Sequence, residues 1–106
     1  MKNEIIVRKL IEYTEKIAGY VQNCDYETFS DNSMLAEACI FNLSQMGELA
    51  NRIDEDFEKA HPEIPWRYIY GLRNRIVHDY EGVNLQLIWE IIHDDLPDLR
   101  ELLLKL

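Results

Sequence analysis

The chain has 106 residues, of which 47% are hydrophobic, and a formal net charge of −9 from 11 basic and 20 acidic residues. This hydrophobic content excludes a disordered chain, and the length suits one domain over residues 1–106. Because coating a nucleic acid requires clustered Lys and Arg, the charge balance excludes a protein with a broad positive surface. Only four Gly and three Pro leave too few turn residues for a fold of many short strands, so long helices are expected.

The cysteines and the first residues exclude further classes. Cys24 and Cys39 form no Cys-x-x-Cys pair, so neither a zinc knuckle nor a redox motif is expected. Reduced thiols are typical of the cytosol, and we expect a cytoplasmic protein. Charged residues are scattered through the first 16 positions, which indicates neither a signal peptide nor a membrane span.

The start of the chain predicts one long helix and a connector. Over residues 3–22, apolar side chains recur at steps of three and four, the spacing of one buried stripe. The segment 23–33 is rich in Asn, Asp and Ser, whose side chains favour turns and caps. It predicts a connector with an N-cap at Ser30 or Asp31.

A second helix is predicted over residues 33–51. Gly47 lies inside it, and because an interior Gly weakens a helix, its presence indicates that a neighbouring helix approaches closely. The acidic segment 54–60 continues or restarts this helix. His61-Pro62 then ends it, since the residue before a proline avoids helical angles.

A third helix is predicted to begin at Pro65 and to run through Val77. A proline suits the first turn of a helix, where a missing N–H costs nothing. Gly82 marks the end of this helix.

The last predicted helix begins at Asn84, which is a suitable N-cap. Pro97 either kinks this helix or restarts it with Asp94 or Asp95 as the cap. The expected fold is therefore all-α, an up-and-down bundle of four to five helices.

Candidate chemistry concentrates in the third predicted helix. Residues 64–78 form the longest run without Asp or Glu, and they include Arg73, Arg75 and His78. An Arg guanidinium binds phosphate through two hydrogen bonds and stays charged, and His exchanges protons near neutral pH. An Arg and a His together suffice for phosphoryl transfer on RNA without a metal.

The spacing of Arg73 and His78 does not by itself establish such a site. Five residues apart on a regular helix, the two side chains are rotated by roughly 140°. A second copy related by two-fold symmetry would bring two Arg and two His into one cleft. The simpler alternative is that an Arg pairs with Asp79 or Glu81 while His78 caps a helix C-terminus.

The order of the residues is more specific than their spacing. The string R-N-x-[IV]-V-H-x-Y at 73–80 follows H-P-x-[IV]-P-W at 61–66 and precedes G-V, W-E and D-L-P. This order resembles the HEPN family, and more narrowly the small stand-alone HEPN toxins encoded beside a minimal nucleotidyltransferase antitoxin. The resemblance covers nearly the whole chain and is most specific over 61–98, while NLSQMGELA at 42–50 is similar to the family's second-helix motif.

The resemblance implies an all-α homodimer that acts as a toxin, a metal-independent endoribonuclease that needs no cofactor. It makes Arg73 and His78 the catalytic pair. Asn74 is the polar residue that typically follows the Arg, and we assign it with Arg75 to binding of the RNA substrate. Tyr80 corresponds to the tyrosine that the partner nucleotidyltransferase modifies with AMP to silence the toxin. We expect DNA to resist cleavage, because the nucleophile would be the ribose 2′-OH.

Two other function classes stay open. The chain could be a non-catalytic HEPN module that binds nucleotides or a partner protein through the same Arg cluster, or a helical subunit that serves assembly alone. Glu48 could line the cleft, although an exposed helix Glu is the commoner interpretation. His61 lacks a second ligand at zinc spacing and fits a helix end, and His93 fits a solvated or interface position. Trp66 and Trp89 are expected to anchor the core or an interface.

Overall fold

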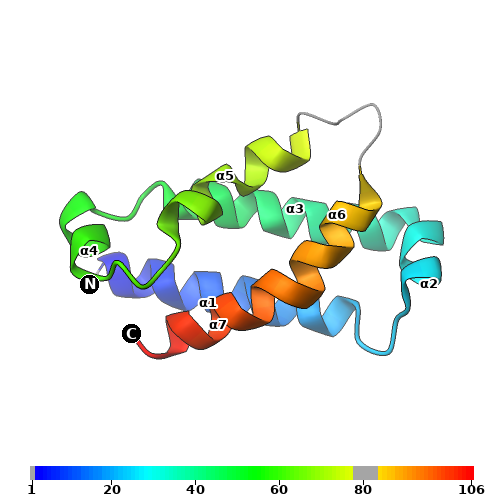
Figure 1. Ribbon diagram of the computed structural model, residues 1–106, viewed down its shortest axis with the longest axis horizontal. Helices are drawn as coiled ribbons and strands as arrows, with labels where there is room; N and C mark the ends of the chain where they lie inside the picture. The colour runs from blue at the N-terminus through cyan, green and yellow to red at the C-terminus, as the bar shows by residue number, and fades with distance from the viewer. Residues whose placement is uncertain (1, 78–83) are drawn as a thin grey trace.

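The computed structural model describes residues 2–77 and 84–106, and every regular element in these ranges is helical (Figure 1). The predicted all-α class is confirmed. In chain order the elements are α1 (Lys2–Tyr20), α2 (Tyr26–Asp31), α3 (Ser33–Ala50), α4 (Glu55–Ala60), α5 (Trp66–Val77), α6 (Leu85–Glu90), the π-helical turn η2 (Ile91–Asp95) and α7 (Leu96–Leu104).

Four helical arms make up the bundle: α1, α3, α5 and the continuous C-terminal arm α6-η2-α7 (Figure 1). Helix α3 packs against both α1 and α5, while α7 packs on α1. Each arm turns a stripe of apolar residues inward, as the spacing predicts. The largest of the almost fully buried side chains are Leu10, Ile17, Phe29, Cys39, Leu43, Met46, Ile69, Leu72, Ile88, Ile91 and Leu103.

The segment predicted as a connector, 23–33, contains the short helix α2. Its N-cap is Asp25, whose carboxylate accepts a hydrogen bond from a backbone N–H at 2.8 Å, and Asn32 caps α3 in the same way at 3.1 Å. The predicted N-cap at Ser30 or Asp31 is therefore wrong, because both residues lie inside α2. Burial of the Phe29 ring holds this polar segment against the core, and the residue composition alone gives no sign of that contact.

The backbones of α3 and α5 come close at Gly47, as its position inside a helix predicts. A Cβ atom at this residue would lie 3.2 Å from the carbonyl oxygen of Ile69 and 3.4 Å from the backbone nitrogen of Arg73. A larger side chain would push the two helices apart. Gly47 therefore sets the distance between α3 and α5 at the turn that carries Arg73.

The C-terminal arm passes through Pro97 without a new cap. The backbone N–H of Leu96 donates to the carbonyl of Ile91, five residues earlier, which is the π-helical pattern. Asp95 has helical backbone angles and makes no capping hydrogen bond with its side chain, so the predicted restart with Asp94 or Asp95 as cap is wrong. A wider turn here accommodates Pro97, whose ring clashes with the carbonyl four residues earlier in a regular α-helix.

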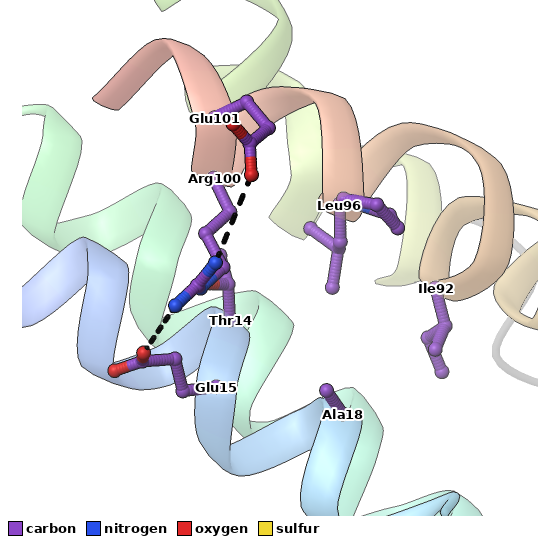
Figure 2. Close-up of a pocket in the computed structure, with 8 residues that line it drawn as sticks. Thr14, Glu15, Ala18, Ile92, Leu96, Arg100 and Glu101 are labelled. Carbon is purple, nitrogen blue, oxygen red and sulfur yellow. Dashed lines mark hydrogen bonds and ion pairs between the residues drawn. The ribbon is translucent and has the colours of Figure 1, made fainter. Parts of the chain in front are cut away.

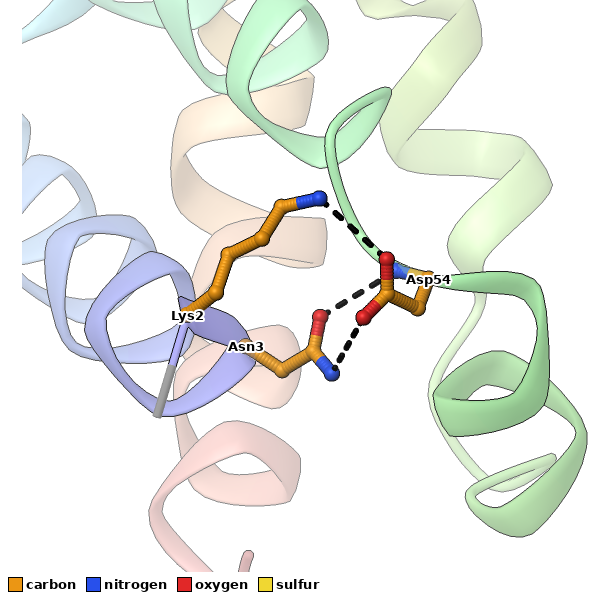
Figure 3. Close-up of polar contacts among 3 residues, drawn as sticks. All are labelled: Lys2, Asn3 and Asp54. Carbon is orange, nitrogen blue, oxygen red and sulfur yellow. Dashed lines mark hydrogen bonds and ion pairs between the residues drawn. The ribbon is translucent and has the colours of Figure 1, made fainter.

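The beginnings of α1 and α4 are joined by side chains (Figure 3). The Asp54 carboxylate accepts hydrogen bonds at 3.2 Å from both Lys2 Nζ and Asn3 Nδ2, and its backbone N–H donates to Asn3 Oδ1 at 3.1 Å. The hydrogen bonds from Lys2 and Asn3 lower the pKa of Asp54.

Two other predictions concern the ends of helices. Asn84 caps α6 as predicted, while Gly82, the predicted end of the third helix, lies outside the described residues. None of the described helices combines the length and the apolar character needed to span a membrane.

Candidate active site on α5

Helix α5 is strongly amphipathic in its second half. Ile69, Leu72 and Ile76, spaced by three and four residues, are buried against the core. Arg73 and Asn74 lie between them in the sequence and are exposed. This pattern follows directly from the 3.6-residue period of a helix. The helix therefore presents Arg73 and Asn74 to solvent.

Arg73 is held by α3. Its Nη1 donates to Oε1 of Glu48, the residue directly after Gly47, while 60% of the Arg73 side chain and 46% of the Glu48 side chain remain exposed. The close approach at Gly47 brings these two side chains together. Glu48, considered in the sequence as a residue lining the cleft, is thus the contact of Arg73, and the guanidinium is open to solvent on its other side.

Arg75 has a different neighbour. Its guanidinium lies 5.5 Å from the centre of the Tyr68 ring, within the range of a cation–π contact. The Tyr68 hydroxyl in turn donates to Oδ2 of Asp95 in η2. Arg73 and Arg75 therefore contact different partners, one on α3 and the other on α5 itself. Nothing in the sequence singles out Tyr68, and Asp95 stands out there only as a candidate helix cap.

The remaining site residues of the sequence analysis lie outside the described residues. These are His78 and Tyr80, together with Asp79 and Glu81 of the alternative pairing. Their positions relative to Arg73 stay predictions. In the described part of α5, the candidate chemistry rests on Arg73, Asn74 and Arg75.

The two other histidines pack on aromatic rings at helical positions. His61 ends α4, stacks on Phe57 at 4.5 Å and approaches Glu63 at 3.3 Å, which confirms the helix-end interpretation. The ring centre of His93 lies 3.8 Å from that of Trp89, and its Nδ1 is 3.0 Å from the Trp89 backbone oxygen. Within residues 2–77 and 84–106, no group of three or more His, Cys, Asp or Glu side chains is arranged to hold a metal ion.

The two cysteines are free thiols. Burial, together with an electrostatic contribution from Cys24, raises the pKa of Cys39 to about 11. The Cys39 thiol is therefore protonated at neutral pH, and a protonated buried thiol is a poor nucleophile. Neither cysteine adds to the candidate site.

The molecule also has a cleft of about 360 Å³ between α1 and the C-terminal arm (Figure 2). Its lining includes Ala18 and Leu96, together with Arg100, which pairs with Glu15 at 2.7 Å and with Glu101 at 3.9 Å. None of its lining residues belongs to α5. Because two carboxylates surround its one guanidinium, this cleft does not favour a phosphate.

Comparison with known proteins gives a consistent picture. A family model described as ribonuclease HepT-like matches residues 10–106. The chain is 32% identical over 92 residues to a candidate RNase of Methanocaldococcus jannaschii, a match that covers 87% of this chain and 84% of the relative. It is 32% identical over 91 residues to a candidate ribonuclease HepT of Thermococcus cleftensis, covering 86% of this chain and 83% of the relative. A candidate RNase of Caldanaerobacter subterraneus is 29% identical over 92 residues, covering 87% and 82%. No solved structure matches the chain significantly.

Proposed function

This chain belongs to the HepT-like ribonuclease family, and we propose that it is a metal-independent endoribonuclease that acts as a toxin in the cytoplasm. One observation in the described residues carries the proposal. An acidic protein presents at Arg73 a guanidinium that is 60% exposed, on a helix held closely against its neighbour. Such a group is a preorganised partner for an RNA phosphate.

RNA binding would replace the carboxylate on Arg73 by a phosphate. The Glu48 carboxylate keeps the guanidinium in place in the free protein, and an exposed pair of this kind contributes at most about 1 kcal/mol. A phosphate oxygen can therefore displace it at low cost. Asn74 and Arg75, which follow Arg73 and are exposed, would contact the neighbouring phosphate or sugar.

In the proposed reaction, His78 transfers protons and Arg73 stabilises the negative charge on the phosphate. The ribose 2′-oxygen gives up its proton, attacks the adjacent phosphorus, and the 5′-oxygen leaves and takes up a proton. His78 takes the first proton or supplies the second. Arg73 stabilises the negative charge that builds on the phosphoryl oxygens. The products are a 2′,3′-cyclic phosphate and a 5′-hydroxyl, and neither a metal nor a cofactor takes part.

The charge of the chain limits how RNA reaches this site. With a net charge of −9, most of the surface repels a polyanion, so RNA would enter only beside the arginines of α5. We therefore expect modest affinity and a preference for exposed single-stranded loops, whose phosphates and bases can approach a small site.

We propose further that the active form is a homodimer. Met34, Phe41 and Glu48 are spaced by seven residues and share one side of α3. Met34 is 79% exposed and Phe41 is 60% exposed, an unusual exposure for large apolar side chains. Because this stripe ends at Glu48, which contacts Arg73, a second copy seated on it would lie beside the candidate site.

The proposed regulation is modification of Tyr80 by a nucleotidyltransferase antitoxin. The Tyr80 oxygen would attack the α-phosphorus of ATP, forming a phosphodiester to AMP while pyrophosphate leaves and the phenol loses its proton. The tethered phosphate would occupy the position of the RNA phosphate, with Arg73 and Arg75 as its counter-ions. Silencing then follows from occupancy of the site rather than from unfolding.

Cleavage of a labelled RNA in EDTA tests the activity. We expect the wild-type protein to cut RNA and leave a 2′,3′-cyclic phosphate, and His78→Ala to lose activity by about 100-fold or more. A DNA of the same sequence and an RNA with 2′-O-methyl at the cut site serve as controls, and both should resist. Cleavage of either control would exclude the 2′-OH as the nucleophile, and a requirement for added metal would overturn metal independence.

Mixed dimers test whether the catalytic pair is shared. Arg73→Ala and His78→Ala chains, each inactive alone, are refolded together with different affinity tags, and the doubly tagged species is isolated. Recovered cleavage indicates that one site draws residues from both copies. An inactive doubly tagged species indicates a site within one chain.

Co-expression with the cognate nucleotidyltransferase tests the role of Tyr80. We expect the wild-type protein to gain the mass of one adenylyl group and to lose its toxicity. Tyr80→Phe should keep much of its nuclease activity but escape silencing. An adduct mapped to another residue, or full neutralisation of the Phe variant, would contradict the role of Tyr80 and leave Arg73 and His78 untouched.

A further inference from the structure

Tyr68 connects α5 to the C-terminal arm. Its hydroxyl donates to Oδ2 of Asp95, and both side chains are half-buried. Burial of the phenol, its hydrogen bond to Asp95 and the charge of that carboxylate all raise the pKa of Tyr68. The phenol is therefore a permanent donor at physiological pH. Helix α5, which otherwise packs mainly on α3, gains through this bond a second point of attachment.

The carboxylate in this bond comes from an irregular turn. Asp95 is the last residue of η2, where the hydrogen bond from Leu96 to Ile91 spans five residues instead of four. A π-helical turn redirects the side chains that follow it, and such turns are common at functional sites. The π-helical turn that accommodates Pro97 thus also sets the direction of the Asp95 side chain.

The guanidinium of Arg75 lies over the Tyr68 ring. The two residues are seven positions apart, which is two helical turns, and the guanidinium carbon lies 5.5 Å from the ring centre. The hydrogen bond to Asp95 holds the Tyr68 ring beside Arg75. The chain of contacts therefore runs from η2 through Tyr68 to an arginine beside Arg73.

We propose that Tyr68 and Asp95 are positioning residues that hold Arg75 ready for an RNA phosphate. This inference rests on the proposed function, in which Arg75 binds the substrate. A flexible arginine loses side-chain entropy when it binds, and a ring that already restricts it reduces that loss. The expected effect is on substrate binding rather than on the chemical step, because neither residue touches the reacting atoms.

Steady-state cleavage of RNA provides the first test. Tyr68→Leu removes both ring and hydroxyl, and we expect KM to rise about 2- to 6-fold with kcat unchanged. Tyr68→Phe and Asp95→Asn keep the ring but lose the hydrogen bond, and should give smaller increases in KM. In an Arg75→Ala background, Tyr68→Leu should add nothing. A drop in kcat alone, or an additive effect on KM with Arg75→Ala, would overturn the proposal.

An NMR measurement on the full chain separates this inference from the proposed activity. The side-chain Nε–Hε signal of Arg75 should be displaced by the ring current of Tyr68. The displacement should vanish in Tyr68→Leu and decrease in Tyr68→Phe, whose ring no longer bonds to Asp95, while Tyr70→Leu, on the same helix, should leave it unchanged. If Tyr68→Leu leaves the signal where it was, the positioning contact is absent. If the signal responds but the wild type cuts no RNA, the contact stands and the proposed function fails.

Discussion

Among residues 2–77 and 84–106, two arginine–glutamate pairs join helices, and they differ in what surrounds them. Arg73 of α5 meets Glu48 of α3 with 60% of its side chain exposed, and Asn74 and Arg75 follow it. Arg100 of α7 meets Glu15 of α1, is 37% exposed and has a second carboxylate, Glu101, at 3.9 Å (Figure 2). The carboxylates of Glu15 and Glu101 together carry more negative charge than the positive charge of the Arg100 guanidinium. Arg73 contacts one carboxylate and stays mostly exposed, as the proposed phosphate contact requires.

The two pairs also differ in what fixes them. At Arg73 the α3 and α5 backbones approach closely through Gly47, so the position of the arginine depends on helix packing more than on its ion pair. At Arg100, both members of the ion pair line a cleft. Since exposed ion pairs contribute little free energy, we expect the first pair to matter for chemistry and the second for neither chemistry nor much stability.

The largest expected effect separates the two arginines. Arg73→Ala should lower kcat/KM for RNA cleavage by about 100- to 1000-fold, because the charge on the phosphoryl oxygens loses its partner. Arg100→Ala, the matched control, should keep wild-type cleavage. Both variants should unfold in urea within about 1 kcal/mol of the wild type. Equal losses of cleavage in the two variants would mean that the difference in surroundings has no functional meaning.

A second prediction concerns the close approach of α3 and α5. Gly47→Ala places a methyl group 3.2 Å from a backbone oxygen that cannot easily move, and we expect a net loss of about 1 kcal/mol in the free energy of unfolding. Gly71→Ala is the control on α5, where a Cβ meets no atom within 4 Å, and it should stabilise the protein by up to about 1 kcal/mol.

Cleavage assays on the same glycine variants sharpen the test. If helix packing fixes Arg73, Gly47→Ala should also reduce RNA cleavage, and Gly71→Ala should not. A Gly47→Ala protein that is less stable but fully active would show that the reaction does not depend on the exact distance between α3 and α5.

Much of this structure follows from local rules. The apolar stripes predicted the four arms, Asn84 predicted a cap, and Gly47 predicted a close helix approach. These features depend on residues close in sequence or on a single missing side chain. The family was also recognisable, because the order of residues from His61 to Asp98 is specific.

The features that the sequence did not predict depend on contacts between distant residues. The short helix α2 packs on the core through the buried Phe29 ring, although the sequence around this residue is typical of a loop. Tyr68 could have been connected with Arg75, since the two lie seven residues apart on one helix. Its bond to Asp95 could not, because the π turn that directs this carboxylate changes the helical period on which such reasoning depends.

A third prediction compares the two glutamates. Glu48→Gln removes the carboxylate that competes with RNA for Arg73, so we expect KM to fall about 2- to 5-fold with kcat unchanged. Glu15→Gln, the equivalent change at Arg100, should leave both constants alone. A fall in kcat for Glu48→Gln would assign Glu48 to the reaction itself rather than to the resting state of Arg73.

The smallest expected effect concerns the scaffold around α1, where Lys2 and Asn3 hold the Asp54 carboxylate (Figure 3). Their hydrogen bonds lower the pKa of Asp54 below the usual value of an aspartate, so the unfolded chain binds the proton more readily than the folded protein does. The resulting stabilisation is complete above the unfolded pKa and is lost as the pH falls through the lower, folded value. Asp54→Asn should therefore unfold more easily than the wild type at neutral pH, and the difference should shrink below about pH 4. Urea unfolding at pH 7, 5 and 3.5 measures this change, with Asp56→Asn, on the same segment, as the control.

RNA cleavage at neutral pH should be equal in the wild type and both variants, because this contact lies on the α1 side of the molecule and Arg73 is held by α3. A loss of cleavage in Asp54→Asn alone would show that the scaffold around α1 and the site on α5 are coupled.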